Sequence, residues 1–492
     1  MDERTESSAG AGLARGATAE GSVDDSAEGR SRDGGGSRSW VRVLAWGWVV
    51  LGAGMCVWRG LLPALSAGWS RDLLVIYGGV RAWARGLDPY GAASALSALR
   101  AGGGDWPMAV ERYLILYPPS MMVLLSPVGW LDFRSAVWAV WLGNVVSLGA
   151  ILWGLLRLTG LRWRSAAGLG LMGFVLAMAP THTSFRMGQV TLPAVALVVW
   201  ALVLESRGRG VLAGVLLGVA TGLKPQMAGL FVLWLVYRKC WWGVAAAVAT
   251  PVALLAIGAV RIELAGADWW NGWRDNVAVF TQGGKGDPRP GVNDSAYQLI
   301  NLESAVHAAG SFALGPVRLG VWALLASLGV WMWWCAARVR GQELVQEKAN
   351  GVAEAGSEAR LRLLVAGALG LVSLLAVYHR AYDGVLAVLA AAWAVSAVAA
   401  VKRESVSLSS STSQGLERNV GWGVLAMLAA LLVPWGPVAH AVVGPRLPGG
   451  WSGSWVWRAV VTPMQAWGML GALGLLAWAM WRRSRRSVGA PG

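Results

Sequence analysis

An acidic residue directly after an apolar segment is the first feature of the chain that could do chemistry. Asp72 follows the apolar run of residues 41–65 and begins a stretch with helical apolar periodicity. The residues that set this period are Leu73, Ile76, Tyr77, Val80, Ala84 and Leu87. The pattern predicts an amphipathic helix at the membrane interface, with Asp72 as its first residue. There the carboxylate could cap the helix, or it could face the water side of the bilayer and serve as a general base.

Lys224 is the second such feature, because it separates two short apolar segments in the sequence Gly222-Leu-Lys224-Pro225. The two segments predict a hairpin with Lys224 at its tip and with Arg209 and Lys239 at its feet. A lysine at that depth is costly unless it meets an anion or a cavity. Two interpretations remain open: Lys224 snorkels to the interface from a span end, or it binds a phosphate carried by a lipid.

The elements that must position these residues are membrane spans. Of the 492 residues, 55% are hydrophobic and only 14% are charged, and the mean hydropathy is +0.50. Soluble domains have about a quarter of their residues charged, so the composition predicts an all-α, polytopic integral membrane protein. The net charge of +15 comes from basic residues that cluster between apolar segments, as in cytoplasmic loops. No basic helix or RNA-type motif occurs, so no nucleic-acid partner is predicted.

The basic residues also predict how the spans are oriented. Their positions between alternate spans place both termini in the cytoplasm, as expected for a multi-pass protein of the cell membrane. The count is then about 12 transmembrane helices plus one re-entrant or interfacial segment. That segment is 114–131, because Pro118, Pro119 and Pro127 interrupt its backbone hydrogen bonds.

Three regions follow from this segmentation. Residues 1–40 are rich in Gly, Ser and Ala without an apolar period, and are predicted to form a disordered cytoplasmic tail. Residues 41–481 are the multi-span domain, with outer loops at 66–113 and 261–317. Residues 482–492 are a basic cytoplasmic tail.

The predicted topology places several polar side chains at one face of the membrane. They are Asp72, Asp88, Arg186, Gln189, Asp294, His379, Arg380 and Asp383. Asp88 is most simply a turn residue, and Asp383 at the start of a span could be a helix cap. Arg81 and Arg85 are expected on the solvated flank of the interfacial helix. The three cysteines and four histidines have no metal-ligand spacing, and no glycine-rich nucleotide motif follows a strand, so neither a metal nor a cofactor is predicted.

Five short motifs follow one another along the chain, and their shared order is more specific than any one of them. They are Arg71-Asp72-Leu-Leu-Val-Ile-Tyr77, Gly86-Leu-Asp-Pro-Tyr90, Tyr117-Pro-Pro119, Gly188-Gln189 and Gly222-Leu-Lys224-Pro225. This order resembles glycosyltransferase family 87, a family of polytopic enzymes in the GT-C superfamily, over residues 41–383. Many relatives read Gly-Gln-x-Asn where this chain has Gly188-Gln-Val-Thr191. The segment Tyr378-His-Arg-Ala-Tyr-Asp383 matches the His/Tyr pattern of the family only loosely.

The resemblance implies a GT-C-type membrane glycosyltransferase. Such enzymes take a hexose, often mannose, from a polyprenyl-phosphate carrier and transfer it to a glycan or glycolipid acceptor at the outer face. Sugar transfer needs a base for the acceptor hydroxyl and positive groups on the departing phosphate. Asp72 is then the predicted catalytic base. The predicted substrate-binding residues are Lys224, Arg186, Gln189, Arg380, Asp383 and Asp88. Among these the cations would hold the phosphate, and Gln189 would bond sugar hydroxyls.

A transporter or flippase of a polyprenyl-linked sugar would explain the same spans and the same buried lysine without any chemistry. Such a protein should carry its key polar groups near mid-membrane, within paired repeats. Here the polar residues gather at one face around long loops, and no two spans repeat each other convincingly. The pattern therefore favours an enzyme whose donor comes from the membrane lipids.

Overall fold

The chain is almost entirely helical in its computed structural model. The structure describes residues 35–66, 71–105, 107, 113–282, 284–350, 355–400, 411–433, 438, 443 and 454–486. The chain divides into two compact units, Met1–Val41 and Arg42–Gly492. Of the first unit only residues 35–41 are described, and they begin helix α1 (Gly35–Met55). Within the described ranges, one isolated antiparallel bridge between Leu299 and Arg380 is the only β-type pairing.

Six helical stretches among the described residues are long and apolar enough to cross a membrane. They have 19 to 29 residues, and at 1.5 Å per residue even the shortest spans roughly the ~30 Å hydrocarbon core. They are formed by α1 with η2 (Cys56–Leu61) and α2 (Leu62–Ser66), α6 (Phe133–Thr159), α13 (Trp241–Leu264), α16 (Leu314–Asn350), α17 (Ala355–Ala376), and η6 (Ala381–Ala387) with α18 (Val388–Ala400). A seventh results if α7 (Ala166–Ala177) and α8 (Ala179–Met187), which are bent by 46°, form one span. The chain is therefore a helical membrane protein, and the count of about a dozen spans stays a prediction.

Shorter helices complete the architecture. They are α3 (Arg71–Ala84), α4 (Ala92–Ala101), α5 (Pro119–Gly129), α9 (Thr191–Glu205), α10 (Gly210–Leu223), α11 (Pro225–Ala228), η4 (Gly229–Phe231), α12 (Val232–Tyr237), α14 (Trp269–Thr281), η5 (Ala296–Gln298), α15 (Leu302–Ala309), α19 (Ser411–Leu428), η7 (Ala429–Leu432), η11 (Trp457–Val461) and α21 (Met464–Arg486). With 11 residues, α5 is only about 17 Å long and too short to cross the bilayer. That length agrees with the predicted re-entrant or interfacial role of residues 114–131.

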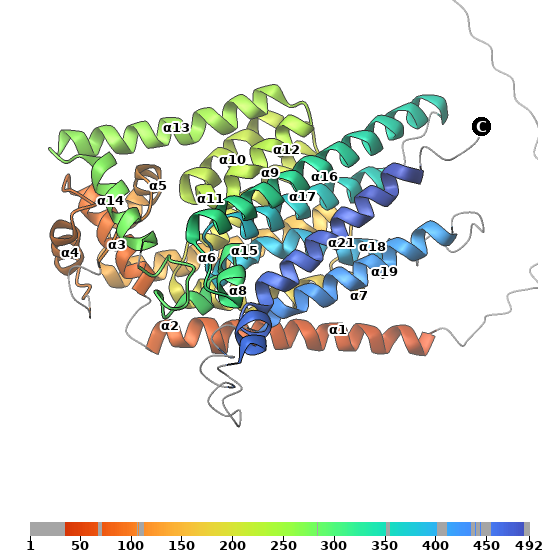
Figure 1. Ribbon diagram of the computed structural model, residues 1–492, viewed down its shortest axis with the longest axis horizontal. Helices are drawn as coiled ribbons and strands as arrows, with labels where there is room; N and C mark the ends of the chain where they lie inside the picture. The colour runs from red at the N-terminus through yellow and green to blue at the C-terminus, as the bar shows by residue number, and fades with distance from the viewer. Residues whose placement is uncertain are drawn as a thin grey trace, which may run out of the picture. The chain divides into compact units, whose positions relative to one another are not determined.

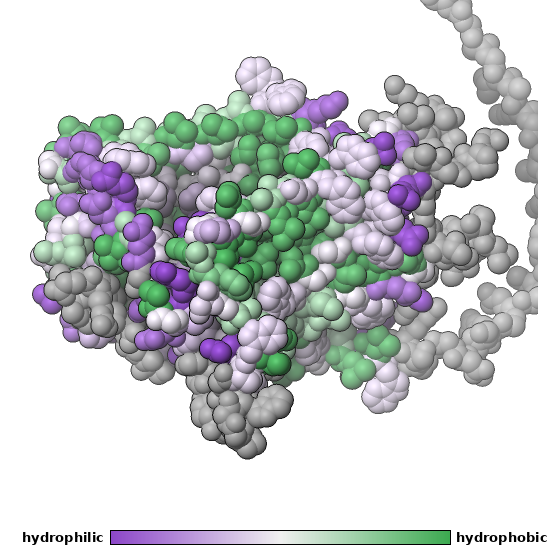
Figure 2. Space-filling view, in the orientation of Figure 1, coloured by the Kyte–Doolittle hydropathy of each residue, from purple (hydrophilic) through white to green (hydrophobic). Residues whose placement is uncertain are grey.

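The long helices of the second unit run side by side, and α3, α4, α5 and α14 gather at one end of them (Figure 1). Of these, α3 and α4 belong to the stretch 66–113 and α14 to the stretch 261–317, so the predicted outer loops contain helices. Figure 2 shows a face on which apolar residues cover the middle while hydrophilic residues gather toward the two ends. The exposed apolar residues of α13, among them Trp242, Val252 and Leu264, fit contact with lipid rather than water.

Helix α13 anchors the short helices that carry the site. The indole Nε1 of Trp83 on α3 donates to the carbonyl of Gly258 on α13 at 3.1 Å. A Cβ on Gly258 would collide with the carbonyl oxygen of Pro119, so the glycine allows α5 to approach α13 closely. Arg261 donates to the carbonyls of Trp83 and Ala84 at 2.8 and 2.7 Å. These are carbonyls of the last turn of α3, which lack partners within the helix and attract a cation.

Helix α3 is buried by its neighbours, contrary to the prediction that one of its faces meets water. It begins at Arg71, one residue before Asp72, and ends at Ala84, so Leu87 lies outside it and is exposed. Residues on all sides of the helix are buried, because α4 and α5 pack on the faces that the periodicity assigned to water. The apolar spacing could not show that these faces are covered. Glycines on them, such as Gly78 and Gly79, also allow other helices and segments to pack closely.

Arg81 shows the same difference from the prediction for a single side chain. Expected on a solvated flank, it is buried and donates to the carbonyls of Gly129 and Leu131 at 3.2 and 2.7 Å. These carbonyls lie at the C-terminal end of α5, where a guanidinium supplies both the missing donors and a favourable charge. Arg85 is exposed, as predicted, and its guanidinium lies 4.9 Å from the ring centroid of Trp130.

Both predicted tails are partly helical. Helix α1 begins at Gly35, inside the predicted tail 1–40, and α21 ends at Arg486, inside the predicted tail 482–492. At the second tail, residues of good helix propensity extend the helix beyond the apolar segment, and glycine and proline follow only later. The rest of both tails lies outside the described residues.

Candidate active site

A cavity of about 810 Å³ lies at the end of the bundle where α3 and α14 gather. Its walls come from the first turn of α3, the segment before α5, the break between α10 and α11, α14 with the loop after it, and residues 377–383. Four of the seven predicted site residues line it, namely Asp72, Lys224, Arg380 and Asp383. Gln189 bonds to one of them. Segments that are far apart in the sequence thus form one site.

Asp72 is held by a side chain from the turn between α8 and α9. Its Oδ2 accepts a hydrogen bond from Nε2 of Gln189 at 2.7 Å, and the residue is half-buried in the first turn of α3. The other oxygen, Oδ1, accepts no hydrogen bond from the described residues. One oxygen is therefore fixed while the carboxylate still lines the cavity. This arrangement suits a group that takes a proton from a bound hydroxyl.

The position of Gln189 depends on the glycine before it. Gly188 ends α8 with φ 59°, a left-handed conformation that other residues adopt only with strain. The turn places Gln189 in full burial, with Nε2 at 2.7 Å from Asp72, 3.1 Å from the Tyr117 hydroxyl and 3.3 Å from the Tyr382 hydroxyl. An ionised carboxylate only accepts hydrogen bonds, so the amide must present its nitrogen to Asp72. The two phenols then hold the amide in that orientation.

Lys224 occupies the break between α10 and α11. Its backbone is extended, with φ −146° and ψ 85°, because the following Pro225 cannot continue the helix and disfavours helical geometry in the preceding residue. Helix α10 has 14 residues, so Lys224 lies about 21 Å along its axis from the basic residues at the hairpin feet. The residue is only 2% exposed. The snorkelling interpretation is therefore wrong.

The ammonium group of Lys224 is already matched by an acid. It donates to Asp383 Oδ1 at 2.6 Å and to Thr191 Oγ1 at 2.7 Å, and lies 4.8 Å from the ring centroid of Tyr382. Asp383 Oδ1 also accepts from Thr191 at 2.9 Å, and its Oδ2 lies 3.0 Å from His379 Nδ1. Asp383 is thus the buried counter-ion of a lysine and not merely a helix cap. Such a pair is stable in a low-dielectric interior only while both partners are present.

Arg380 is a lining cation that forms no direct ion pair with a described residue. Its Nε donates to the hydroxyl of Tyr378 at 2.6 Å, and no carboxylate of the described residues forms an ion pair with it. Burial raises the pKa of Tyr378 to about 12, so the phenol is neutral at physiological pH. The carboxylate of Asp72 interacts favourably with Arg380 across the cavity but does not form an ion pair with it. Lys285 also lines the cavity, but it is exposed. Arg380 is therefore the group best placed to meet an anion inside the cavity.

Two predicted residues lie away from the cavity. Asp88 occupies a turn, where its Oδ1 accepts from the backbone N–H of Tyr90 at 2.9 Å, as the turn interpretation expects. Arg186 is exposed near the end of α8 and does not line the cavity, whereas the next residue, Met187, does. Neighbours on a helix point about 100° apart, so a motif position alone cannot show which of the two faces the site.

Four residues of the network carried no predicted role. They are Tyr117, Thr191, His379 and Tyr382. All four lie within the segments compared with the family in the sequence, and this membership could have marked them as candidate site residues. Trp273 also lines the cavity and donates to the carbonyl of Leu116 at 3.0 Å, but nothing distinguished it among 32 tryptophans. In the part of the chain that the structure describes, no three His, Cys, Asp or Glu side chains gather as metal ligands.

The comparison with known families identifies the class of protein. The family model of glycosyltransferase family 87 matches residues 115–357. The chain therefore carries a glycosyltransferase family 87 domain, which confirms the resemblance and supports a glycosyltransferase. No curated protein and no solved structure matches the chain. The matched range includes Tyr117, Gln189 and Lys224, while Asp72 and Asp383 lie on either side of it.

Proposed function

We propose that the chain transfers a hexose, with mannose as the first candidate, from a polyprenyl-phosphate donor to a glycan or glycolipid acceptor. The observation that carries this proposal is a single cavity that holds a fixed carboxylate, Asp72, and a cation without a direct ion pair, Arg380. Sugar transfer needs one group of each kind. The family match supports the class of reaction.

Asp72 is the proposed general base. The acceptor hydroxyl oxygen attacks the anomeric carbon, and the carboxylate takes the proton of that hydroxyl. The bond between the anomeric carbon and the phosphate oxygen breaks, and its electrons leave with the polyprenyl phosphate. Gln189 keeps the carboxylate oriented through its 2.7 Å hydrogen bond. It acts as a positioning residue here, because its amide is already engaged with Asp72 and two phenols.

Arg380 is the proposed phosphate ligand. A guanidinium pairs well with phosphate oxygens, and it stabilises the negative charge that develops on the leaving group. Lys224, predicted from the sequence for this role, instead neutralises Asp383. The apolar lining suits the prenyl chain of the donor and includes Val75, Leu114, Val277, Phe280 and Val377.

A transfer assay tests the proposal. Purified protein is incubated with radiolabelled polyprenyl-phosphate mannose, glucose or galactose and a total lipid extract, and the products are separated. We expect one donor to give a labelled product. Arg380→Gln should raise KM for that donor about 10- to 150-fold, the equivalent of ~1.5–3 kcal/mol for a charge-assisted hydrogen bond.

Arg186→Gln is the matched control, because it removes the same charge from a residue outside the cavity. Its KM should stay within about threefold of wild type, in the range of ordinary surface substitutions. Larger losses for Arg186→Gln than for Arg380→Gln would refute the assignment of the phosphate ligand. Absence of labelled product from every polyprenyl-phosphate donor, with transfer from a nucleotide sugar, would refute the proposed donor class.

The transporter alternative is not favoured. The matched family is one of glycosyltransferases, and the polar network gathers at one end of the bundle around a fixed carboxylate. A sugar-lipid carrier has no need for a proton acceptor held in this way.

We further propose that the cavity faces the outside of the cell membrane and that both termini are cytoplasmic, since the basic residues between spans support this orientation. The test uses single cysteines, in a background without native cysteines, at exposed positions on the two predicted sides. Those at Arg100 and Asp275 should react with an impermeant maleimide in intact cells. Those at Arg207 and Arg418 should react only after permeabilisation. Labelling of Arg100 and Arg207 from the same side would contradict the orientation.

A further inference from the structure

A second cavity, of about 550 Å³, lies at the turn between α6 and α7. Helix α6 starts beside α4, where the Phe133 N–H donates to the carbonyl of Gly102, and its 27 residues extend about 40 Å. The turn is therefore far from the proposed active site. Eight residues line the cavity, and none of them is acidic.

The guanidinium groups of three arginines that line this cavity have no counter-ion among the described residues. They belong to Arg157, Arg162 and Arg164, and none of them forms an ion pair with a described residue. The sequence contains no Asp or Glu between Asp132 and Glu205, so no acid of this hairpin can neutralise them. Three cations at one turn repel each other unless an anion lies between or beside them.

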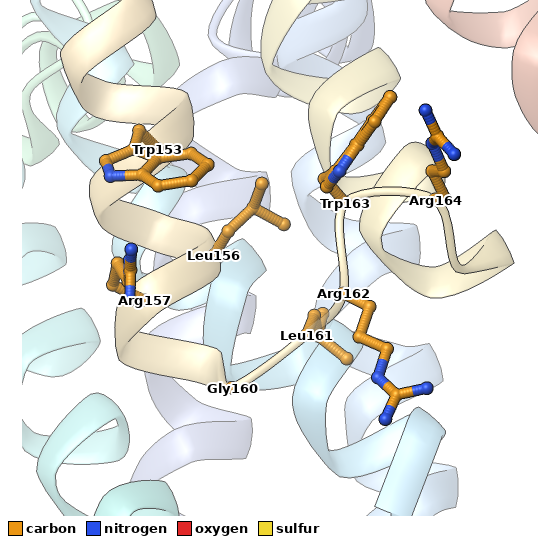
Figure 3. A pocket seen from close by; sticks show the side chains of 8 residues that line it. All are labelled: Trp153, Leu156, Arg157, Gly160, Leu161, Arg162, Trp163 and Arg164. Carbon is orange, nitrogen blue, oxygen red and sulfur yellow. The ribbon is translucent and has the colours of Figure 1, made fainter.

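Two of these arginines lie against tryptophan rings. The guanidinium carbon of Arg157 lies 4.7 Å from the ring centroid of Trp153, and that of Arg164 lies 4.4 Å from that of Trp163. Figure 3 shows the two indoles on opposite sides of the cavity, with Leu156 reaching into the space between. Tryptophan prefers the level of the lipid headgroups, and both indoles are more than 40% exposed.

The turn itself is well defined. Gly160 ends α6 with φ 64°, and Ser165 begins α7 as its N-cap, with its side chain accepting from the N–H of Gly168 at 3.1 Å. The arginines therefore project from a fixed backbone, which lowers the entropy lost when a ligand binds. They stand apart around the rim in Figure 3, so a ligand that meets all three must be larger than one inorganic ion.

We propose that this cavity binds the headgroup of an anionic phospholipid. The phosphodiester would accept hydrogen bonds from the nearest guanidinium group, and the other guanidinium groups would attract the headgroup by their charge. The acyl chains would run along Trp153 and Leu156 toward the apolar middle of the helices. Basic pockets between membrane helices bind lipid headgroups in this way. The site is separate from the proposed active site. The proposal does not depend on which end of the bundle is cytoplasmic.

The test measures lipid binding to the full chain in detergent by native mass spectrometry, with titrations of phosphatidylglycerol and phosphatidylcholine. Wild type should bind phosphatidylglycerol at least tenfold more tightly. The triple variant Arg157→Gln, Arg162→Gln, Arg164→Gln should lose about 100-fold in affinity for phosphatidylglycerol, because each arginine near the surface of an anionic membrane contributes a factor of about five. The triple Lys variant should recover most of it. The single variants, each expected to lose about fivefold, test the site even if the triple variant does not fold.

The matched control removes three arginines that lie near the other end of α6, namely Arg85, Arg100 and Arg134, which are exposed. It changes the net charge equally and should leave the affinity within about twofold of wild type. An equal loss in this control would reduce the effect to overall charge and overturn the proposal. Equal affinity of wild type for the two lipids would overturn it too. Displacement of phosphatidylglycerol by millimolar inorganic phosphate would show a site for the free ion only, and so would also contradict a lipid site.

Discussion

Asp72→Asn should lower turnover by about 10²- to 10⁴-fold, while leaving donor binding and stability nearly unchanged. General-base catalysis contributes rate factors of this size, and an amide cannot take the proton of the acceptor hydroxyl. The Asn side-chain oxygen can still accept the hydrogen bond that Gln189 donates to Asp72 Oδ2 at 2.7 Å. The geometry of the site should therefore survive the substitution. Single-turnover rates with the labelled donor, together with KM and thermal unfolding in detergent, check each part of this expectation.

Asp132→Asn is the control for this variant. Asp132 also stands at a helix start, where its Oδ1 accepts from the N–H of Ser135 at 3.0 Å, but it does not line the cavity. Asparagine caps a helix about as well as aspartate, so the control should keep full turnover and stability. If Asp72→Asn also keeps turnover within tenfold of wild type, Asp72 is not the base. Asp294 would then be the remaining candidate, because it lines the cavity and forms no ion pair with a described residue.

Composition and periodicity predict much of the helical framework, but they do not predict how deeply each helix is buried among its neighbours. A long apolar segment such as α13 is recognisable because lipid accepts apolar side chains on every face of a helix. The burial of α3 was not recognisable, because the same apolar spacing suits a helix at the interface and a helix covered by neighbours. Arg81 shows the limit clearly. Its partners are carbonyls at the end of α5, and a backbone acceptor leaves no mark in the sequence of the donor.

The sequence predicted which residues belong to the site where the residue type itself requires a polar environment. It did not predict which of these residues pair with each other. An acid such as Asp72 and a lysine in an apolar segment both demand a polar environment, so both could be placed at a site. Which cation meets the substrate depends on whether Lys224 pairs with an acid 159 residues further along the chain. Lys224 finds Asp383, and Arg380 finds a neutral phenol. The sequence contains all four residues but does not say which of them meet.

Lys224→Met should destabilise the protein by about 3–5 kcal/mol, the usual cost of removing one partner of a buried ion pair. Lys224 and Asp383 are 2.6 Å apart, and both side chains are 3% exposed. Methionine fills much of the space but leaves the carboxylate of Asp383 with Thr191 and His379 as its remaining partners. The free energy of unfolding in mixed micelles measures this loss. Arg274→Met, which breaks an exposed pair with Asp275, should cost less than about 1 kcal/mol.

The double variant Lys224→Met, Asp383→Leu decides what the loss means. Replacing both charges with apolar side chains removes the uncompensated carboxylate, so most of the stability lost in Lys224→Met should return. Such recovery is expected only if the role of Lys224 is to neutralise Asp383. If Lys224→Met instead unfolds like wild type and weakens donor binding, the ammonium group is a phosphate ligand after all. In that case the ion pair with Asp383 must open when the donor binds, and Arg380→Gln should have the smaller effect on KM.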